Sequence, residues 1–130
     1  MLDRELTAFF DSYRDAFNRL DASGVARHFH VPSMLISGQG RVVWSTHDDV
    51  LANMEALTAH YRADGFDHAT FQPRAVLAVR DNPVVDIAWT IERTSGLSPR
   101  RFGTAYNLQR TPGGWLVAVC TAYEEQELRE

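Results

Sequence analysis

The chain has 130 residues, of which 45% are hydrophobic and 23% charged, and its formal net charge is −4 at pH 7. This balance predicts one globular domain over 1–130 and excludes a disordered chain. The acidic charge argues against a nucleic-acid partner, because phosphate binding needs clustered positive charge, and no apolar run is long enough to cross a membrane. A single cysteine and an acidic N-terminus without signal-peptide features favour a cytoplasmic protein.

The first thirty residues predict two helices. Apolar residues recur every three or four positions, which is the spacing of one buried helical face: Leu2, Leu6, Phe9, Phe10, Tyr13, Phe17 and Leu20. Asp21 is suited to cap a second, short helix that continues to about Phe29. Pro32 then ends it, because proline lacks the backbone donor that a helix needs.

A small hairpin and a third helix are expected next. The residues at 33–37 and 41–44 are typical of short strands joined by a glycine-containing turn at 38–40. Ser45, followed three residues later by Asp48, resembles a capping box that begins a helix, and Gly65 is suited to end it. The buried stripe of this helix is predicted to comprise Val50, Met54, Leu57 and Tyr61.

The second half of the chain predicts four long strands at 69–80, 84–94, 101–110 and 115–123. Short turns at 81–83, 95–99 and 112–114 connect them, so consecutive strands are expected to pair antiparallel. The predicted fold class is therefore α+β, with a sheet of about four long strands plus a short hairpin and with three N-terminal helices on one face.

The residue pattern of the last strand indicates whether the outer face of the sheet is exposed to water. Trp115, Val117, Val119 and Thr121 are expected to share one face, and the opposite face is also apolar or small. A face exposed to water would carry more charge, so we expect a second subunit to cover the outer face.

The order of elements and three local segments resemble the nuclear transport factor 2-like superfamily over essentially the whole chain. The segments are the helix that Asp21 opens, the turn Asp81-Asn82-Pro83 and the closing turn before Trp115. The resemblance implies a cystatin-like cone, in which a curved sheet wraps around a long helix, with a pocket at the open end and dimers formed through the sheet. Members include ketosteroid isomerases, scytalone dehydratase, limonene epoxide hydrolases and SnoaL-like cyclases, and fold alone does not choose among them. Relatives often place histidines and an aspartate after the tryptophan of the last strand, whereas 117–123 contains neither here.

Two residues are candidate catalytic bases. Asp86 is a carboxylate within a strand and in a pocket would have the raised pKa of a base beside a carbonyl. The alternative interpretation places it on the face opposite Trp89, paired with an arginine such as Arg74. His28 is the second candidate, because an imidazole titrates near neutrality, although a surface histidine at a helix end is the more ordinary interpretation.

Aromatic and hydroxyl side chains are the candidate ligand-binding residues of the pocket: Tyr13, Phe17, Trp89, Thr104, Tyr106 and Thr121. Tyr13 or Tyr106 could act as the oxyanion partner of a catalytic base. We predict no metal site, because the pair His28 and His30 has no third ligand at matching spacing, and no organic cofactor.

The leading functional hypothesis is the binding of a small apolar or aromatic molecule in a mostly apolar pocket of a homodimeric protein. A SnoaL-like or ketosteroid-isomerase-like isomerase or dehydratase, with Asp86 or His28 as base, is the first alternative. A protein-interaction module that uses the sheet face is the second.

Overall fold

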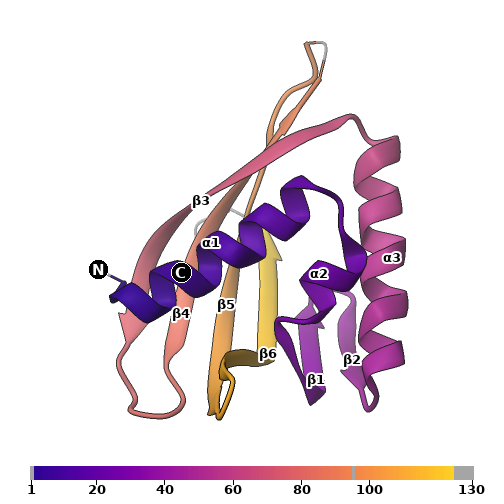
Figure 1. Ribbon diagram of the computed structural model, residues 1–130. Helices are drawn as coiled ribbons and strands as arrows, with labels where there is room; N and C mark the ends of the chain where they lie inside the picture. The colour runs from indigo at the N-terminus through magenta and orange to yellow at the C-terminus, as the bar shows by residue number, and fades with distance from the viewer. Residues whose placement is uncertain (1, 95, 125–130) are drawn as a thin grey trace.

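A computed structural model describes residues 2–94 and 96–124, and over these the chain is an α+β unit (Figure 1). Position 95 of the turn predicted at 95–99 lies outside the described residues. The helices are α1 (Arg4–Asn18), α2 (Ala22–Ala26) and α3 (His47–Ala63). The strands are β1 (Phe29–Ser37), β2 (Gly40–Trp44), β3 (Phe66–Leu77), β4 (Val84–Arg93), β5 (Arg100–Thr111) and β6 (Gly114–Glu124).

The first two helices begin at aspartate caps. The Asp3 side chain accepts a hydrogen bond from the backbone N–H of Leu6, and Asp21 accepts one from Gly24. The second helix is shorter than predicted, because β1 already begins at Phe29. Pro32 lies within β1, where the ladder to β6 shifts register, and such a break accommodates a residue that has no N–H to donate.

The third helix begins one residue later than predicted. Thr46, not Ser45, is the N-cap, and its hydroxyl accepts from the Asp49 backbone while the Asp49 carboxylate accepts from the Thr46 backbone. This is a complete capping box. Gly65 follows the helix with φ of +84°, a left-handed conformation that glycine adopts at little cost.

All six strands of the described chain form one sheet in the order β2-β1-β6-β5-β4-β3. The predicted antiparallel meander from β3 to β6 is confirmed, and the α+β fold class with it. The short hairpin belongs to the same sheet, because β1 pairs with β6 in parallel.

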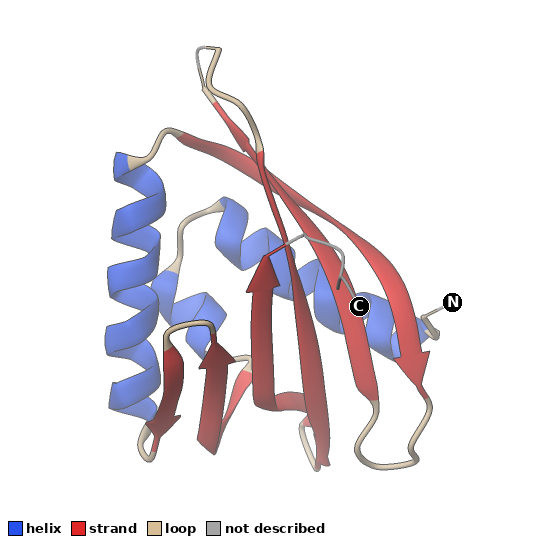
Figure 2. Ribbon diagram, turned by 180° about the vertical axis from the view of Figure 1, so that it is seen from behind, coloured by secondary structure: helices blue, strands red, loops and turns tan. Residues whose placement is uncertain are grey.

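The helices lie on one side of this curved sheet. In Figure 1, α1 crosses in front of β3, β4 and β5, and α3 stands beside β1 and β2. Figure 2, from behind, shows the strands in front of the helices. We call the side that faces the helices the inner face and the opposite side the outer face.

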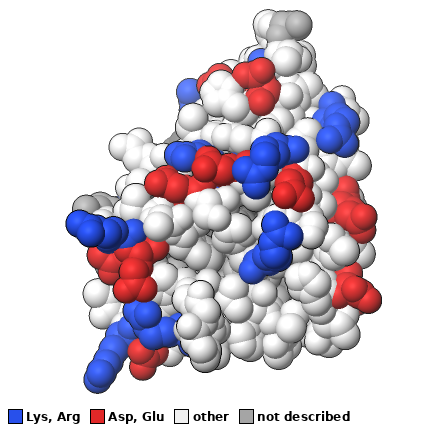
Figure 3. All heavy atoms as spheres, in the orientation of Figure 1, with Lys and Arg blue, Asp and Glu red and all other residues white. Residues whose placement is uncertain are grey.

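Charges on the molecular surface are mixed in sign. Figure 3 shows acidic and basic side chains side by side on the face that carries α1, with wide uncharged areas between them. None of the helices in the described residues has the length and hydropathy that a membrane crossing requires.

Candidate functional site

A cavity of about 190 Å³ lies between α1, α3 and the inner face of the sheet. Its wall is almost entirely apolar and aromatic, and none of the described side chains that form it is an acid, a histidine, a lysine or an arginine. The wall consists of Tyr13, Phe17, Phe29, Leu35, Trp44, Asn53, Met54, Leu57, Tyr61, Ala69, Trp89, Ile91, Phe102, Thr104, Tyr106, Cys120 and Ala122. The cavity can therefore hold an uncharged, mostly apolar group.

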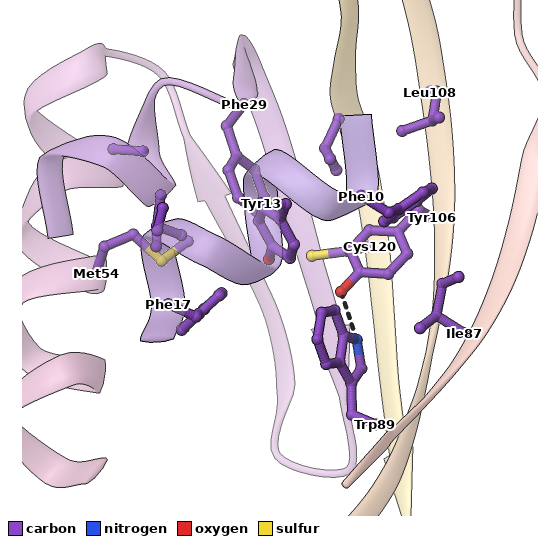
Figure 4. Close-up of a cluster of buried hydrophobic side chains, with 14 of the residues drawn as sticks. Phe10, Tyr13, Phe17, Phe29, Met54, Ile87, Trp89, Tyr106, Leu108 and Cys120 are labelled. Atoms are coloured by element: carbon purple, nitrogen blue, oxygen red, sulfur yellow. Dashed lines mark hydrogen bonds between the residues drawn. The ribbon is translucent and has the colours of Figure 1, made fainter. Parts of the chain in front are cut away.

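Tyr13 of α1 stands at the centre of the aromatic wall. Its ring centroid is 5.1 Å from Phe17, 5.7 Å from Tyr106 and 5.9 Å from Trp89, and its contacts with Phe17 and Tyr106 are edge-to-face. The side chain is 5% exposed. These contacts hold the phenol ring of α1 against β4 and β5, as Figure 4 shows.

A hydrogen bond joins two of the wall residues across neighbouring strands. The indole Nε1 of Trp89 donates to the hydroxyl oxygen of Tyr106 at 2.9 Å (Figure 4). An indole N–H can only donate, so the Tyr106 oxygen is the acceptor and its own hydrogen is left for another partner. Burial raises the pKa of both Tyr106 and Tyr13, so both phenols stay neutral and can act as donors.

Cys120 contributes a thiol to the same part of the wall. It is 5% exposed, and burial raises its pKa from 9.0 to about 12. A thiol with this pKa remains protonated at neutral pH and is a poor nucleophile. Its role in the wall is that of a small, weakly polar group.

Five of the six predicted ligand-binding residues lie in the cavity wall: Tyr13, Phe17, Trp89, Thr104 and Tyr106. Alternation along β4 and β5 places the strand residues of this set on the inner face, where Trp89 pairs with Phe102 and Ile87 pairs with Thr104. That a ligand contacts them stays a prediction.

Thr121, the sixth, lies on the outer face instead. Asn107 pairs with Val119 and Leu108 with Val117, so Ala118 is an extra residue in β6. Because of this β-bulge, the residues of β6 after Ala118 point to the opposite face from the one that strict alternation predicts. Thr121 therefore pairs with outer-face Ala105, and Cys120 and Ala122 line the cavity in its place.

Asp86 also lies on the outer face, so its position does not support a role as a base in the cavity. It alternates with inward-facing Ile87 and pairs with Ala105. Its Oδ1 accepts a hydrogen bond of 2.5 Å from the hydroxyl of Tyr123. The Tyr123 ring lies over Gly103, where a Cβ would come within 2.2 Å of the ring.

His28 lies between α1 and α2, outside the cavity wall. Its Nδ1 is 2.8 Å from the carbonyl oxygen of Gly24, which can only accept, so this nitrogen carries a proton. Its Nε2 is 2.9 Å from the hydroxyl of Ser12. Burial lowers the pKa of His28, which favours the neutral imidazole. These bonds join the helices, and the structure does not place His28 where it could take a proton from a molecule in the cavity.

The predicted absence of a metal site rested on His28 and His30 having no third ligand. His30 binds the carbonyl of Pro32 through its own Nδ1. Within 2–94 and 96–124, no three His, Cys, Asp or Glu residues gather as metal ligands.

The wall residues that the sequence analysis missed come mainly from α3 and from the hairpin. Asn53 and Met54 project from α3, and Phe29, Leu35 and Trp44 from β1 and β2. The helical spacing of Met54, Leu57 and Tyr61 predicted a buried stripe, but a stripe does not say whether it faces solid core or a cavity.

Comparison with known proteins agrees with this architecture. The sequence profile of the family described as NTF2-like protein (DUF6841) matches residues 4–125. No curated protein matches the chain in sequence.

Solved structures share the fold at low sequence identity. An NTF2-like protein with a cystatin-like fold from Novosphingobium aromaticivorans has a TM-score of 0.77 at 15% identity, over 95% of this chain and 82% of its own. A cystatin-like domain of unknown function from Nostoc punctiforme has a TM-score of 0.75 at 14% identity, over 98% and 82%. A ketosteroid isomerase-like protein from Erwinia carotovora atroseptica has a TM-score of 0.70 at 18% identity, over 97% and 100%. With the profile covering nearly the whole chain, the protein belongs to the NTF2-like family DUF6841.

Proposed function

We propose that the protein binds a small, mostly apolar molecule, of the size of one substituted ring, in the cavity between α1, α3 and the sheet. The observation that supports this is an apolar cavity whose polar side chains are all uncharged in their ordinary states. A cavity of about 150 Å³ accommodates benzene, so about 190 Å³ suits a ring with short substituents and is small for a whole steroid.

The hydroxyl groups at the inner end of the cavity suggest how such a molecule is oriented. The Tyr106 oxygen already accepts a hydrogen bond from Trp89, and the buried phenols of Tyr13 and Tyr106 keep their protons. A carbonyl or ether oxygen on the ligand would accept from one of these hydroxyls. A carboxylate there would have no cation in the wall to pair with, and burying it would be costly.

Filling the cavity should abolish this binding without unfolding the protein. We expect Ala122→Leu to weaken binding of neutral ring compounds such as indole or 4-phenylbutanamide at least tenfold, because the added atoms occupy the cavity. Tryptophan fluorescence can measure binding, since Trp44 and Trp89 line the wall.

The matched control is Ala59→Leu, which adds the same atoms on the exposed side of α3. Unchanged binding in Ala122→Leu, with normal binding in Ala59→Leu, would show that the compounds bind elsewhere. No binding of any neutral ring compound by the native protein would contradict the proposed function.

The isomerase or dehydratase alternative receives no support from the site. It requires a base within hydrogen-bond reach of the substrate, and the described wall of the cavity offers neither a carboxylate nor an imidazole. The likeness to a ketosteroid isomerase-like protein is a likeness of fold.

We also propose that a second copy of the chain covers the outer face. Small residues lie at the centre of this face: Ala88 pairs with Gly103, over which the Tyr123 ring lies, and Ala105 pairs with Thr121. Met34 pairs with Val119 beside them and adds apolar surface. A patch of small and apolar residues can match its own copy across a two-fold axis, as a closed dimer requires.

A large charge at the centre of the outer face should separate the two copies. We expect Ala105→Arg to convert a dimer into a monomer, measured as molar mass by light scattering after size exclusion. Ala59→Arg, on the exposed side of α3, should remain dimeric. A native protein that is monomeric at micromolar concentration, or a dimeric Ala105→Arg variant, would contradict this proposal.

A further inference from the structure

Asn53 is a polar residue on the side of α3 that faces the cavity. It lies three residues after Val50 and four before Leu57, so it shares their face of the helix, and like Leu57 it lines the cavity. Asparagine is also a poorer helix former than the leucine and methionine that fill this face nearby. Packing and helix propensity would therefore both favour an apolar residue at this position.

The protein satisfies the amide of Asn53 only weakly. Its Nδ2 is 3.8 Å from the sulfur of Met54, a weak acceptor, and the side chain makes no other hydrogen bond with residues 2–94 and 96–124. Its Oδ1 thus has no donor within this part of the chain. Because Asn53 is half-buried, water can serve this oxygen in the unliganded protein, and a ligand that displaces the water must replace its hydrogen bond.

The Oδ1 of Asn53 differs in kind from the other polar atoms of the cavity wall. The remaining polar side chains of the described wall are phenols, indoles, a threonine hydroxyl and a thiol, and each of these carries a hydrogen that it can donate. An amide carbonyl oxygen can only accept. Asn53 therefore offers the cavity an acceptor for a hydrogen-bond donor on the ligand.

Asn53 and the phenol of Tyr106 approach the cavity from opposite walls. Asn53 belongs to α3, where it is the neighbour of Met54, whereas Tyr106 belongs to β5. Figure 4 shows Met54 at the α3 side of the view and Tyr106 at the opposite side. A ring that lies between these walls can present one polar group to Tyr106 and a second one, at its other end, to Asn53.

We propose that Asn53 determines the specificity of the cavity by selecting an uncharged ring with a hydrogen-bond donor at the end that faces α3. This inference rests on the proposed function and names its ligand class: an aryl carbonyl compound with an amino or hydroxyl group on the opposite side of the ring. The carbonyl accepts from the phenols, and the amino or hydroxyl group donates to Asn53. A ring without this donor leaves Oδ1 unpaired once water has been displaced, and an unpaired buried acceptor is a strong basis for rejection.

Two probes of nearly the same shape test this selection, 4-aminoacetophenone and 4-methylacetophenone. Both are uncharged at neutral pH and both carry the carbonyl acceptor, but only the amino compound can donate to Asn53. Isothermal titration of the full chain should show tighter binding of the amino compound. In Asn53→Leu, whose side chain has the same branched shape, we expect the ratio of the two dissociation constants to shift by about tenfold toward the methyl compound.

Two further variants separate recognition by the oxygen from a change in the shape of the cavity. Asn53→Asp keeps an oxygen acceptor at the same place and should retain the preference for the amino compound. Glu55→Leu, at an exposed position of the same helix, should bind both compounds as the native protein does. Because the native amide is only weakly satisfied, Asn53→Leu should melt at the same temperature as the native protein or at a higher one.

The outcomes separate this inference from the proposed function. If both ketones bind and Asn53→Leu leaves their ratio unchanged, the specificity role is wrong while the cavity remains a binding site. The same holds if the native protein binds indole but neither ketone. If it binds no neutral ring compound at all, both proposals fail together. An equal loss of both ketones in Asn53→Leu would indicate a structural role and overturn the inference, as would a preference that Asn53→Asp abolishes.

Discussion

Replacing Phe10 by alanine is expected to lower the free energy of unfolding by about 3–5 kcal/mol, the usual cost of deleting a buried aromatic ring. Phe10 has no exposed surface, and its ring lies 5.2 Å from Tyr106 and 6.1 Å from Phe71, measured between centroids. It thereby joins α1 to β3 and β5. Because a domain of this size is stable by only about 5–15 kcal/mol, the variant should lose a large share of the stability of the native protein.

Urea denaturation followed by circular dichroism measures this loss, and Phe9→Ala is the matched control. Phe9 is the adjacent residue of the same type in the same helix but is only half-buried, against Phe10 and His28. It should lose clearly less stability than Phe10. Equal losses for the two variants would mean that α1 is not held by the face that the structure buries.

The helix face that contains Phe10 was predictable because its physical cause is local. Apolar residues at helical spacing must face a core, whatever that core is, and the structure buries Leu6, Phe10, Tyr13 and Phe17 as the spacing predicts. The antiparallel meander from β3 to β6 was predictable for a similar reason. Turns such as Asp81-Asn82-Pro83 are too short for any other connection.

The placement of β1 beside β6 has no local cause, and the sequence analysis missed it. Two strands separated by most of the chain pair in parallel there, and their contact depends on how the whole sheet curves. The pairing matters for the site, because it brings Phe29 and Leu35 into the cavity wall opposite α3.

The face of β6 was mispredicted at Thr121 because of one extra residue. Strict alternation from Trp115 predicts that Thr121 lies on the same face as Val117. The bulge at Ala118 instead places every later residue of β6 on the opposite face from the predicted one. Nothing in the run from Val117 to Ala122 marks the bulge, since every residue is small or β-branched and fits either face. A single undetected bulge therefore exchanges Thr121 for Cys120 in the predicted pocket.

Alkaline pH should destabilise the protein strongly between about pH 9 and 12, and Cys120 should cause the first part of the loss. Its pKa is 9.0 in the ordinary state and about 12 when folded, because burial disfavours the thiolate. The unfolded chain thus releases a proton across this window that the folded chain keeps, so stability is complete below pH 9 and falls as pH rises. At about 1.4 kcal/mol per pKa unit, Cys120 alone accounts for about 4 kcal/mol at pH 12.

Tyrosines extend the same effect to higher pH. Burial raises the pKa of Tyr61 from 10.0 to about 12 and raises those of Tyr13 and Tyr106 as well, so their contribution begins near pH 9 and grows above pH 10. The thiol is therefore isolated by the difference in stability between the native protein and Cys120→Ala at each pH. Urea denaturation at half-unit steps from pH 8 to 10 should show a steeper fall of stability in the native protein than in Cys120→Ala, and equal slopes for the two would contradict the raised pKa of the thiol.

This experiment also tests whether the cavity is as dry as the proposed function requires. The apolar residues of the wall raise these pKa values by keeping water away from the ionisable groups. Water in the cavity would solvate the thiolate of Cys120 and return its pKa toward 9. A folded protein whose thiol absorbance at 240 nm titrates near pH 9 would contradict the dry cavity. A thiol that stays protonated to pH 11 would mean that a ligand meets an uncharged wall at any physiological pH, so binding of neutral ring compounds should not change between pH 7 and 9.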